Sequence, residues 1–195
     1  MSGLVLSKIL CVILLTCSPA YTQGNQLPTP ETAPPHDYFT AHEVASTKGY
    51  LDNLTLNHTD KILGYIRENK MDAAILDVKY TLDRFANHPK GLQMAIIVSR
   101  LSKQTSLAVF YFERALKLYP QHAITYAQYG MFLLGSGQVD AAIARLKQAV
   151  EIDTKMVGAY ALLAKAYSKH GDTELAVQAA EKARALGFKG EIPLQ

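Results

Sequence analysis

A 34-residue repeat constrains the fold of this chain more than any other feature. Its clearest unit runs from Ala123 to Met156, where two amphipathic segments meet at Gly135-Ser136-Gly137. Stepping by 34 residues in either direction gives four consecutive units without insertion or deletion, namely 55–88, 89–122, 123–156 and 157–190. A period of this length is typical of stacked helical hairpins, because a single hairpin cannot bury its apolar face alone.

The same residue types recur at fixed positions of the unit. The third unit has Tyr126 at position 4, Gly130 at 8, Leu133 at 11, Ala142 at 20 and Ala149 at 27. Small residues at positions 8 and 20 let two helices approach closely, while the larger side chains fill the space between them. This pattern resembles the tetratricopeptide repeat (TPR) family, in particular bacterial-type exported TPR proteins. The resemblance implies an all-α, right-handed superhelical solenoid of about four helical hairpins.

The match varies along the array. It is clearest in the third and fourth units, whereas Ile96 and Ser99 depart from positions 8 and 11 of the second. It is weakest in the first helix of the first unit, where His58 and Lys61 occupy positions that are usually apolar. The register predicts eight helices, over 56–68, 71–86, 90–102, 105–118, 123–135, 139–152, 157–169 and 173–186.

The N-terminus has the layout of a secretory signal peptide. Lys8 precedes a short apolar run, and Ser18-Pro19-Ala20 places small residues before a cut after Ala20. The sequence therefore predicts a cleaved signal over residues 1–20 and a periplasmic or secreted protein. The alternative is an outer-membrane lipoprotein, because Leu14-Leu15-Thr16-Cys17 looks like a degenerate lipoprotein box with Cys17 as the lipidation site. The membrane is an expected partner only in that alternative.

Three further segments flank the repeats. Residues 21–36 are rich in proline and predict a flexible spacer. Residues 37–54 predict an irregular lead-in with one short helix over 41–46. The array fills 55–190, and a tail over 191–195 follows. We expect Phe188, Ile192 and Leu194 to fold back over the last hairpin, because terminal repeats need their apolar face covered.

The TPR resemblance also implies a binding surface, since the first helix of each hairpin lines the concave face in that family. Carried over unit by unit, the matching positions predict a partner-binding groove that consists of Arg67, Lys90, Gln93, Ile97, Arg100, Ala127, Met131, Leu134, Lys165 and Lys169. The groove has an apolar centre with basic flanks. It suits a protein or peptide that is apolar and carries some acidic residues. A one-position rotation of the helix would instead place Met131 and Leu134 in the core.

Other function classes find little support. The chain has a formal net charge of +3, which does not indicate nucleic-acid binding. No pair of its histidines has helical ligand spacing with a nearby carboxylate, and no phosphate-cradling loop or nucleophile elbow occurs. We therefore expect no metal, no cofactor and no catalytic residues. His88 and His122 share position 34 of their units and are interpreted as structural turn residues.

The sequence predicts a non-enzymatic exported scaffold that binds protein partners, in the assembly of an envelope or secretion complex. The lipoprotein alternative would act in pilus or outer-membrane biogenesis. A hydrolase or metal-binding protein is the hypothesis from another class.

Overall fold

The computed structural model describes residues 35–41 and 45–193. The predicted signal, Cys17, the spacer up to residue 34 and Leu194 lie outside these residues. The helices are α1 (Ala45–Asn57), the 3₁₀ turn η2 (Thr59–Lys61), α2 (Ile62–Arg67), α3 (Met71–Arg84), α4 (Pro89–Leu101), α5 (Thr105–Leu118), α6 (Ala123–Gly135), α7 (Val139–Ile152), α8 (Val157–His170) and α9 (Thr173–Ala185). No helix among the described residues is long and apolar enough to cross a membrane.

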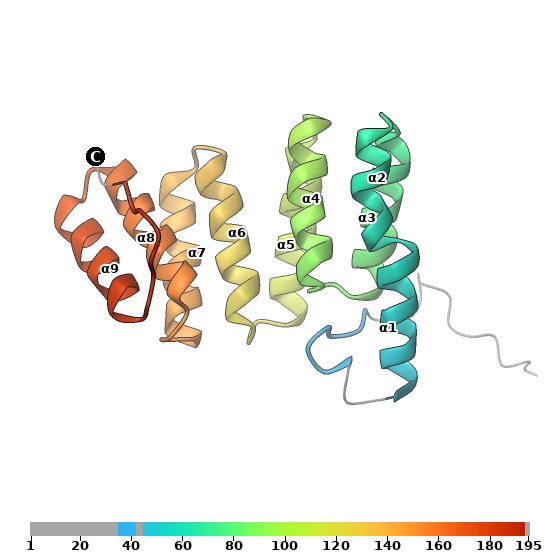
Figure 1. The fold of residues 1–195 in the computed structure, drawn as a ribbon, viewed down its shortest axis with the longest axis horizontal. Coiled ribbons are helices and arrows are strands. Elements are labelled where there is room, and N and C mark those ends of the chain that lie inside the picture. Colours follow the sequence, from blue (N-terminus) through green and yellow to red (C-terminus); the bar gives the residue numbers. More distant parts are fainter. Residues whose placement is uncertain (1–34, 42–44, 194–195) are drawn as a thin grey trace, which may run out of the picture.

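The helices form two layers along one row of hairpins (Figure 1). Each helix packs against the next in the chain, and α2, α4, α6 and α8 also contact one another in that order. We call these four the inner helices, and α3, α5, α7 and α9 the outer helices. This is the helical-hairpin solenoid that the repeat predicts, and the predicted fold class is confirmed.

The third hairpin shows why the repeat needs small residues. A Cβ atom added at Gly130 would lie 2.5 Å from Cγ of Leu146, which is fully buried on α7. Ala142 at position 20 is also fully buried. The helices α6 and α7 can pack this closely only because one side of their contact has no side chain. In the second hairpin the larger Ile96 occupies position 8 and is itself buried in the core.

The C-terminal tail returns over the last hairpin, as Figure 1 shows. Ile192 is buried in the main core, and Phe188 packs against that core. The prediction that the tail covers the end of the array is confirmed for these two residues.

The first unit differs from the prediction. A regular helix, α1, occupies much of the expected irregular lead-in, and it ends at Asn57, where a helix over 56–68 was expected to begin. The chain leaves helical geometry at His58, which has φ −123° and ψ −67°. The ring of His58 stacks on Tyr80 at 4.0 Å between centroids, and its Nδ1 lies 2.9 Å from Asp77 Oδ1. These contacts to α3 hold the polar side chain at a position where the repeat usually has an apolar one.

Residues 35–41 are also part of the fold. Ala41 joins Leu51, Leu54 and Phe85 in a second, smaller core, against which Tyr38 packs. The N–H of His36 donates to the carbonyl of Arg84 at 2.6 Å. Residues 35 and 36 of the predicted spacer and residues 37–41 of the predicted lead-in therefore take part in the fold.

Candidate functional site

Large apolar side chains are exposed along the inner helices. Met131 and Ile124 on α6 are each 37% exposed, and Leu101 on α4 is 54% exposed. Leu63 on α2 is exposed as well, and Ile97 on α4 is half-buried. Because consecutive inner helices contact one another, these side chains belong to one layer of the array. Exposed apolar surface on such a layer is a common feature of interaction sites.

Two predicted groove residues are not open to a partner. Leu134 is 4% exposed and Ala127 is 9% exposed, and both belong to the main core. Their assignment to the groove is therefore wrong. The alternative from the sequence, in which a rotated helix places both Met131 and Leu134 in the core, holds for Leu134 only. Met131, three residues earlier on α6, remains exposed.

The charged side chains of the inner helices α4, α6 and α8 are all basic. The helices α4, α6 and α8 contain no aspartate or glutamate, whereas each outer helix contains at least one. Arg100, Lys165 and Lys169 are exposed and make no ion pair within the described residues. The guanidinium of Arg100 lies over Gly135 of the next inner helix, in the space that a Cβ atom would take.

On the outer helices, by contrast, two arginines pair with carboxylates of the preceding outer helix. Arg114 Nη1 lies 2.6 Å from Asp83 Oδ1, and Arg145 Nη2 lies 3.0 Å from Glu113 Oε1. Exposed apolar residues occur on these helices too, for example Phe110 at 58%. What distinguishes the inner surface is therefore that α4 and α8 carry basic side chains and that α4, α6 and α8 carry no carboxylate, whereas basic and acidic side chains occur together on each outer helix.

The remaining predicted basic and polar groove residues are exposed, but some of them already have an ion-pair or hydrogen-bond partner within the chain. Lys90 Nζ lies 2.5 Å from Asp60 Oδ1, so its charge is paired. Arg67 donates from Nε to the carbonyl of Leu63, one turn earlier on α2, at 3.2 Å. Gln93 is exposed on α4. The open positive groups are thus concentrated on α4 and α8.

Comparison with known families decides what kind of array this is. Two protein-family models described as tetratricopeptide repeat match the chain, one at residues 133–189 and one at residues 111–144. The chain is a TPR protein. Arrays of this family are typically non-catalytic scaffolds for protein–protein interaction. No curated protein sequence matches this TPR protein.

Solved structures of similar fold include several of MamA. One is "MamA 41-end from Desulfovibrio magneticus RS-1", with 18% identity, a TM-score of 0.52, and coverage of 72% of this chain and 84% of that chain. Another is "Crystal structure of MamA", with 20% identity, a TM-score of 0.51, and coverage of 72% of this chain and 91% of that chain. At these identities the likeness concerns the fold alone.

His88 helps to fix the start of α4. The buried His88 precedes α4, and its Nδ1 accepts a hydrogen bond from the N–H of Gly91 at 3.1 Å, which caps the helix. Its Nε2 lies 3.3 Å from the hydroxyl of Thr55. Burial is the main cause that lowers the pKa of His88 from 6.5 to about 4, so the ring is neutral at pH 7. No group of three or more potential metal ligands occurs among the described residues.

The sequence analysis missed one set of interacting residues. Asp37, Asn87 and Gln121 meet at the loops between hairpins, although 50 or more residues separate Asp37 from the other two. The signal that could have found them is the similarity between residues 85–88 and 119–122, which share an aromatic residue, an amide and a histidine at the same three positions.

Proposed function

We propose that this TPR protein is a non-enzymatic exported scaffold whose inner surface binds a polypeptide with apolar and acidic side chains. The observation that carries the proposal is the unpaired charge of Arg100, Lys165 and Lys169 on helices that contact α6, which carries the exposed Met131 and Ile124. An apolar segment would cover the exposed side chains, and carboxylates on its flanks would pair with the free cations.

The physical argument rests on what the isolated chain leaves unsatisfied. Guanidinium and ammonium groups form charge-assisted hydrogen bonds with carboxylates, and these are stronger than bonds between neutral groups. A preformed surface also loses little conformational entropy when a partner binds, because the helices are already ordered. Electrostatic attraction mainly accelerates association and selects the partner, while the apolar contacts supply most of the affinity.

The charge on the inner surface can be tested with two matched sets of substitutions. Arg100→Glu, Lys165→Glu and Lys169→Glu together reverse the open cations of the inner helices. Lys79→Glu, Lys117→Glu and Lys147→Glu make the same change in net charge on exposed positions of α3, α5 and α7. Both variants and the unaltered chain would be immobilised and exposed to an envelope extract of the source organism, and the captured proteins quantified by mass spectrometry.

We expect a specific set of captured proteins to fall at least ten-fold with the inner variant and to change little with the outer variant. The same proteins should be released when the salt concentration is raised, because exposed ion pairs are screened. Equal capture by the two variants would contradict the proposal.

Export is part of the proposal and depends on residues 1–20. In the envelope the scaffold would hold partners during assembly of an envelope or secretion complex. Acylation at Cys17 would instead tether the same array to the outer membrane, where a role in pilus or outer-membrane biogenesis would follow.

A further inference from the structure

Two loops between hairpins carry the same four-residue pattern. Residues 85–88 read Phe-Ala-Asn-His and residues 119–122 read Tyr-Pro-Gln-His, 34 positions apart. Each has an aromatic residue first, an amide third and a histidine fourth. The equivalent loop of the third unit, residues 153–156, reads Asp-Thr-Lys-Met and lacks the pattern. We call the two matching loops the paired loops; they join α3 to α4 and α5 to α6.

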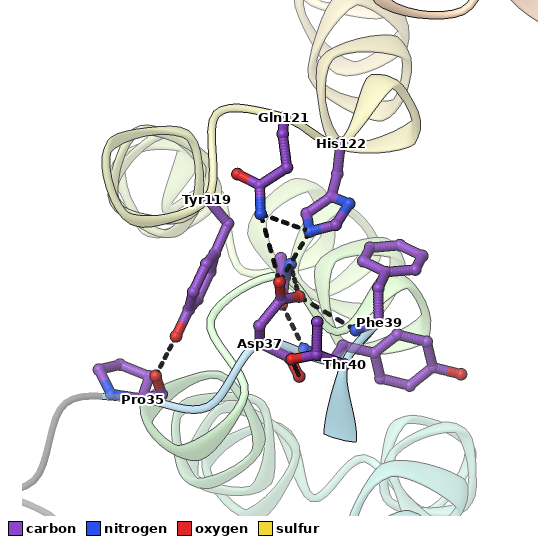
Figure 2. A network of polar contacts seen from close by, with 9 residues as sticks. Pro35, Asp37, Phe39, Thr40, Tyr119, Gln121 and His122 are labelled. Carbon is purple, nitrogen blue, oxygen red and sulfur yellow. Dashed lines mark hydrogen bonds and ion pairs between the residues drawn. The ribbon is translucent and has the colours of Figure 1, made fainter. Parts of the chain in front are cut away.

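The side chain of Asp37 is contacted from both paired loops, and Figure 2 shows Gln121 and His122 of the second loop directed toward it. Asn87 Nδ2 donates to Asp37 Oδ1 at 2.7 Å, and His122 Nε2 lies 2.9 Å from Asp37 Oδ2. Gln121 Nε2 lies 3.4 Å from the same Oδ2. The N–H of Phe39 donates to Asp37 Oδ1 at 3.0 Å. The carboxylate is thus held by groups from both loops, 50 to 85 residues away in the sequence.

The aromatic residues of the segment meet the remaining members of the pattern. The ring of Tyr38 lies 4.7 Å from that of His88. The ring of Phe39 lies 4.3 Å from that of His122. At the start of the segment, the ring of His36 lies 5.3 Å from that of Phe85, and the hydroxyl of Tyr119 donates to the carbonyl of Pro35. Every first, third and fourth residue of the paired loops therefore contacts residues 35–39.

The buried side chain of Asn87 is the most specific part of the contact between the first of the paired loops and residues 35–39. Its side chain is completely buried, and both ends of its amide bond the segment, because Oδ1 accepts from the N–H of Tyr38 at 2.8 Å. Burial, the largest single cause, raises the pKa of Asp37, but the hydrogen bonds from Asn87, His122 and the N–H of Phe39, together with the charge of His122, lower it by more. Asp37 is therefore bound as a carboxylate at pH 7.

We propose that the paired loops form a second ligand-binding site, separate from the inner surface, for a short segment with Asp followed by two aromatic residues in a hydrogen-bonded turn. Residues 35–41 are its intramolecular ligand. Within the segment the hydrogen bonds centre on Asp37, and the rings of Tyr38 and Phe39 contact each other. The remaining polar and ring contacts of these residues reach distant parts of the chain. That is the contact pattern of a bound peptide. The duplication explains the location of the site, since only the first two units carry the pattern.

The site can be tested in trans with the full-length chain. Asp37→Ala and Phe39→Ala together remove the side chains that hold the intramolecular ligand. A fluorescent peptide with the sequence of residues 35–41 is then titrated with this variant, with the unaltered chain and with a Lys155→Ala control, which alters the equivalent third loop. We expect the double variant to bind the peptide at least ten-fold more tightly than the other two, as measured by anisotropy. A peptide with alanine in place of the aspartate should not bind. A folded double variant that fails to bind, or equal binding by all three proteins, overturns the proposal.

A second measurement decides the question even if the double variant unfolds. Amide hydrogen exchange in the unaltered chain compares the N–H of Tyr38 with the amides of Phe112 and Phe132 in the main core. A ligand can dissociate while the array stays folded, so the Tyr38 amide should exchange at least 100-fold faster than the two core amides. Equal rates would mean that the segment leaves only on global unfolding, and would overturn the proposal. A concentration-dependent dimer that exchanges this segment would refute the intramolecular assignment.

Discussion

The cap on α4 makes His88 an acid-sensitive point in the array. Nδ1 can accept from the N–H of Gly91 only while it carries no proton. The pKa of His88 falls from 6.5 to about 4 on folding, mainly because of burial. A backbone hydrogen bond and the nearby Asp60 oppose this shift, while Lys90 acts in the same direction as burial. As the pH drops below 6.5, the unfolded chain therefore takes up a proton that the folded chain refuses, and stability is lost until the pH reaches about 4.

The magnitude follows from linkage between protonation and folding. The full pKa difference corresponds to about 3 kcal/mol, and about 2 kcal/mol of this is lost between pH 7.5 and pH 5. His88→Asn isolates the effect, because asparagine can accept the same capping bond but does not titrate. Removing the ring changes the stability by an amount that does not depend on pH, so the comparison is between slopes.

Urea unfolding followed by circular dichroism at pH 7.5, 6.5, 5.5 and 5.0 provides the assay. The free energy of unfolding of the unaltered chain should fall by about 2 kcal/mol more than that of the Asn variant over this range. Parallel curves for the two proteins would refute the reasoning, since they would show that His88 does not titrate differently in the folded and unfolded chains.

Three other outcomes are expected. Leu146→Ala should lower the free energy of unfolding by about 2 to 5 kcal/mol, because it leaves a cavity at the closest approach of α6 and α7; a loss below 1 kcal/mol in urea unfolding would contradict the packing described. Ala142→Leu should destabilise the fold by at least about 1 to 3 kcal/mol, since this fully buried position has no room for a larger side chain, and an unchanged melting temperature would argue against it. The intact mass of the protein from its host should correspond to a chain that starts at Tyr21. A mass that corresponds to a chain starting at a diacylated Cys17 would instead support the lipoprotein alternative.

The regular part of the fold could be predicted from the sequence because its information is local and repeated. For α5, α6 and α7 the predicted bounds agree with the structure at both ends, and for α4, α8 and α9 they differ by one residue at one or both ends. Turns, small residues and apolar spacing specify each hairpin, and the 34-residue register aligns them. The inner and outer layers follow from the same pattern.

The first unit could not be predicted in this way. Whether a polar residue such as His58 breaks a helix or is accommodated depends on partners that lie about 20 residues away, Asp77 and Tyr80. The position of Asp37 depends on partners still further along the chain. Position-by-position matching also misassigned Leu134, because a TPR position number does not specify how a particular helix is rotated about its axis.

The basic residues of the inner helices could be identified from the sequence, but the sequence did not show which of them form ion pairs. Lys90 and Arg100 look equivalent as basic residues at inner positions of one helix. Only the structure shows that Lys90 is neutralised by Asp60 while Arg100 has no acidic partner among the described residues. The free cations that support the proposed function are therefore a subset of those predicted.

The most direct test of the account is site-specific photocrosslinking from the two faces of the array in its native host. A photoreactive residue would replace Met131 on the inner helix α6 in one strain and Phe110 on the outer helix α5 in another, both exposed positions. The account predicts a discrete polypeptide adduct from position 131 that Arg100→Glu, Lys165→Glu and Lys169→Glu abolish, and no such adduct from position 110. No adduct from position 131, or the same adduct from both positions, would contradict a binding role for the inner surface.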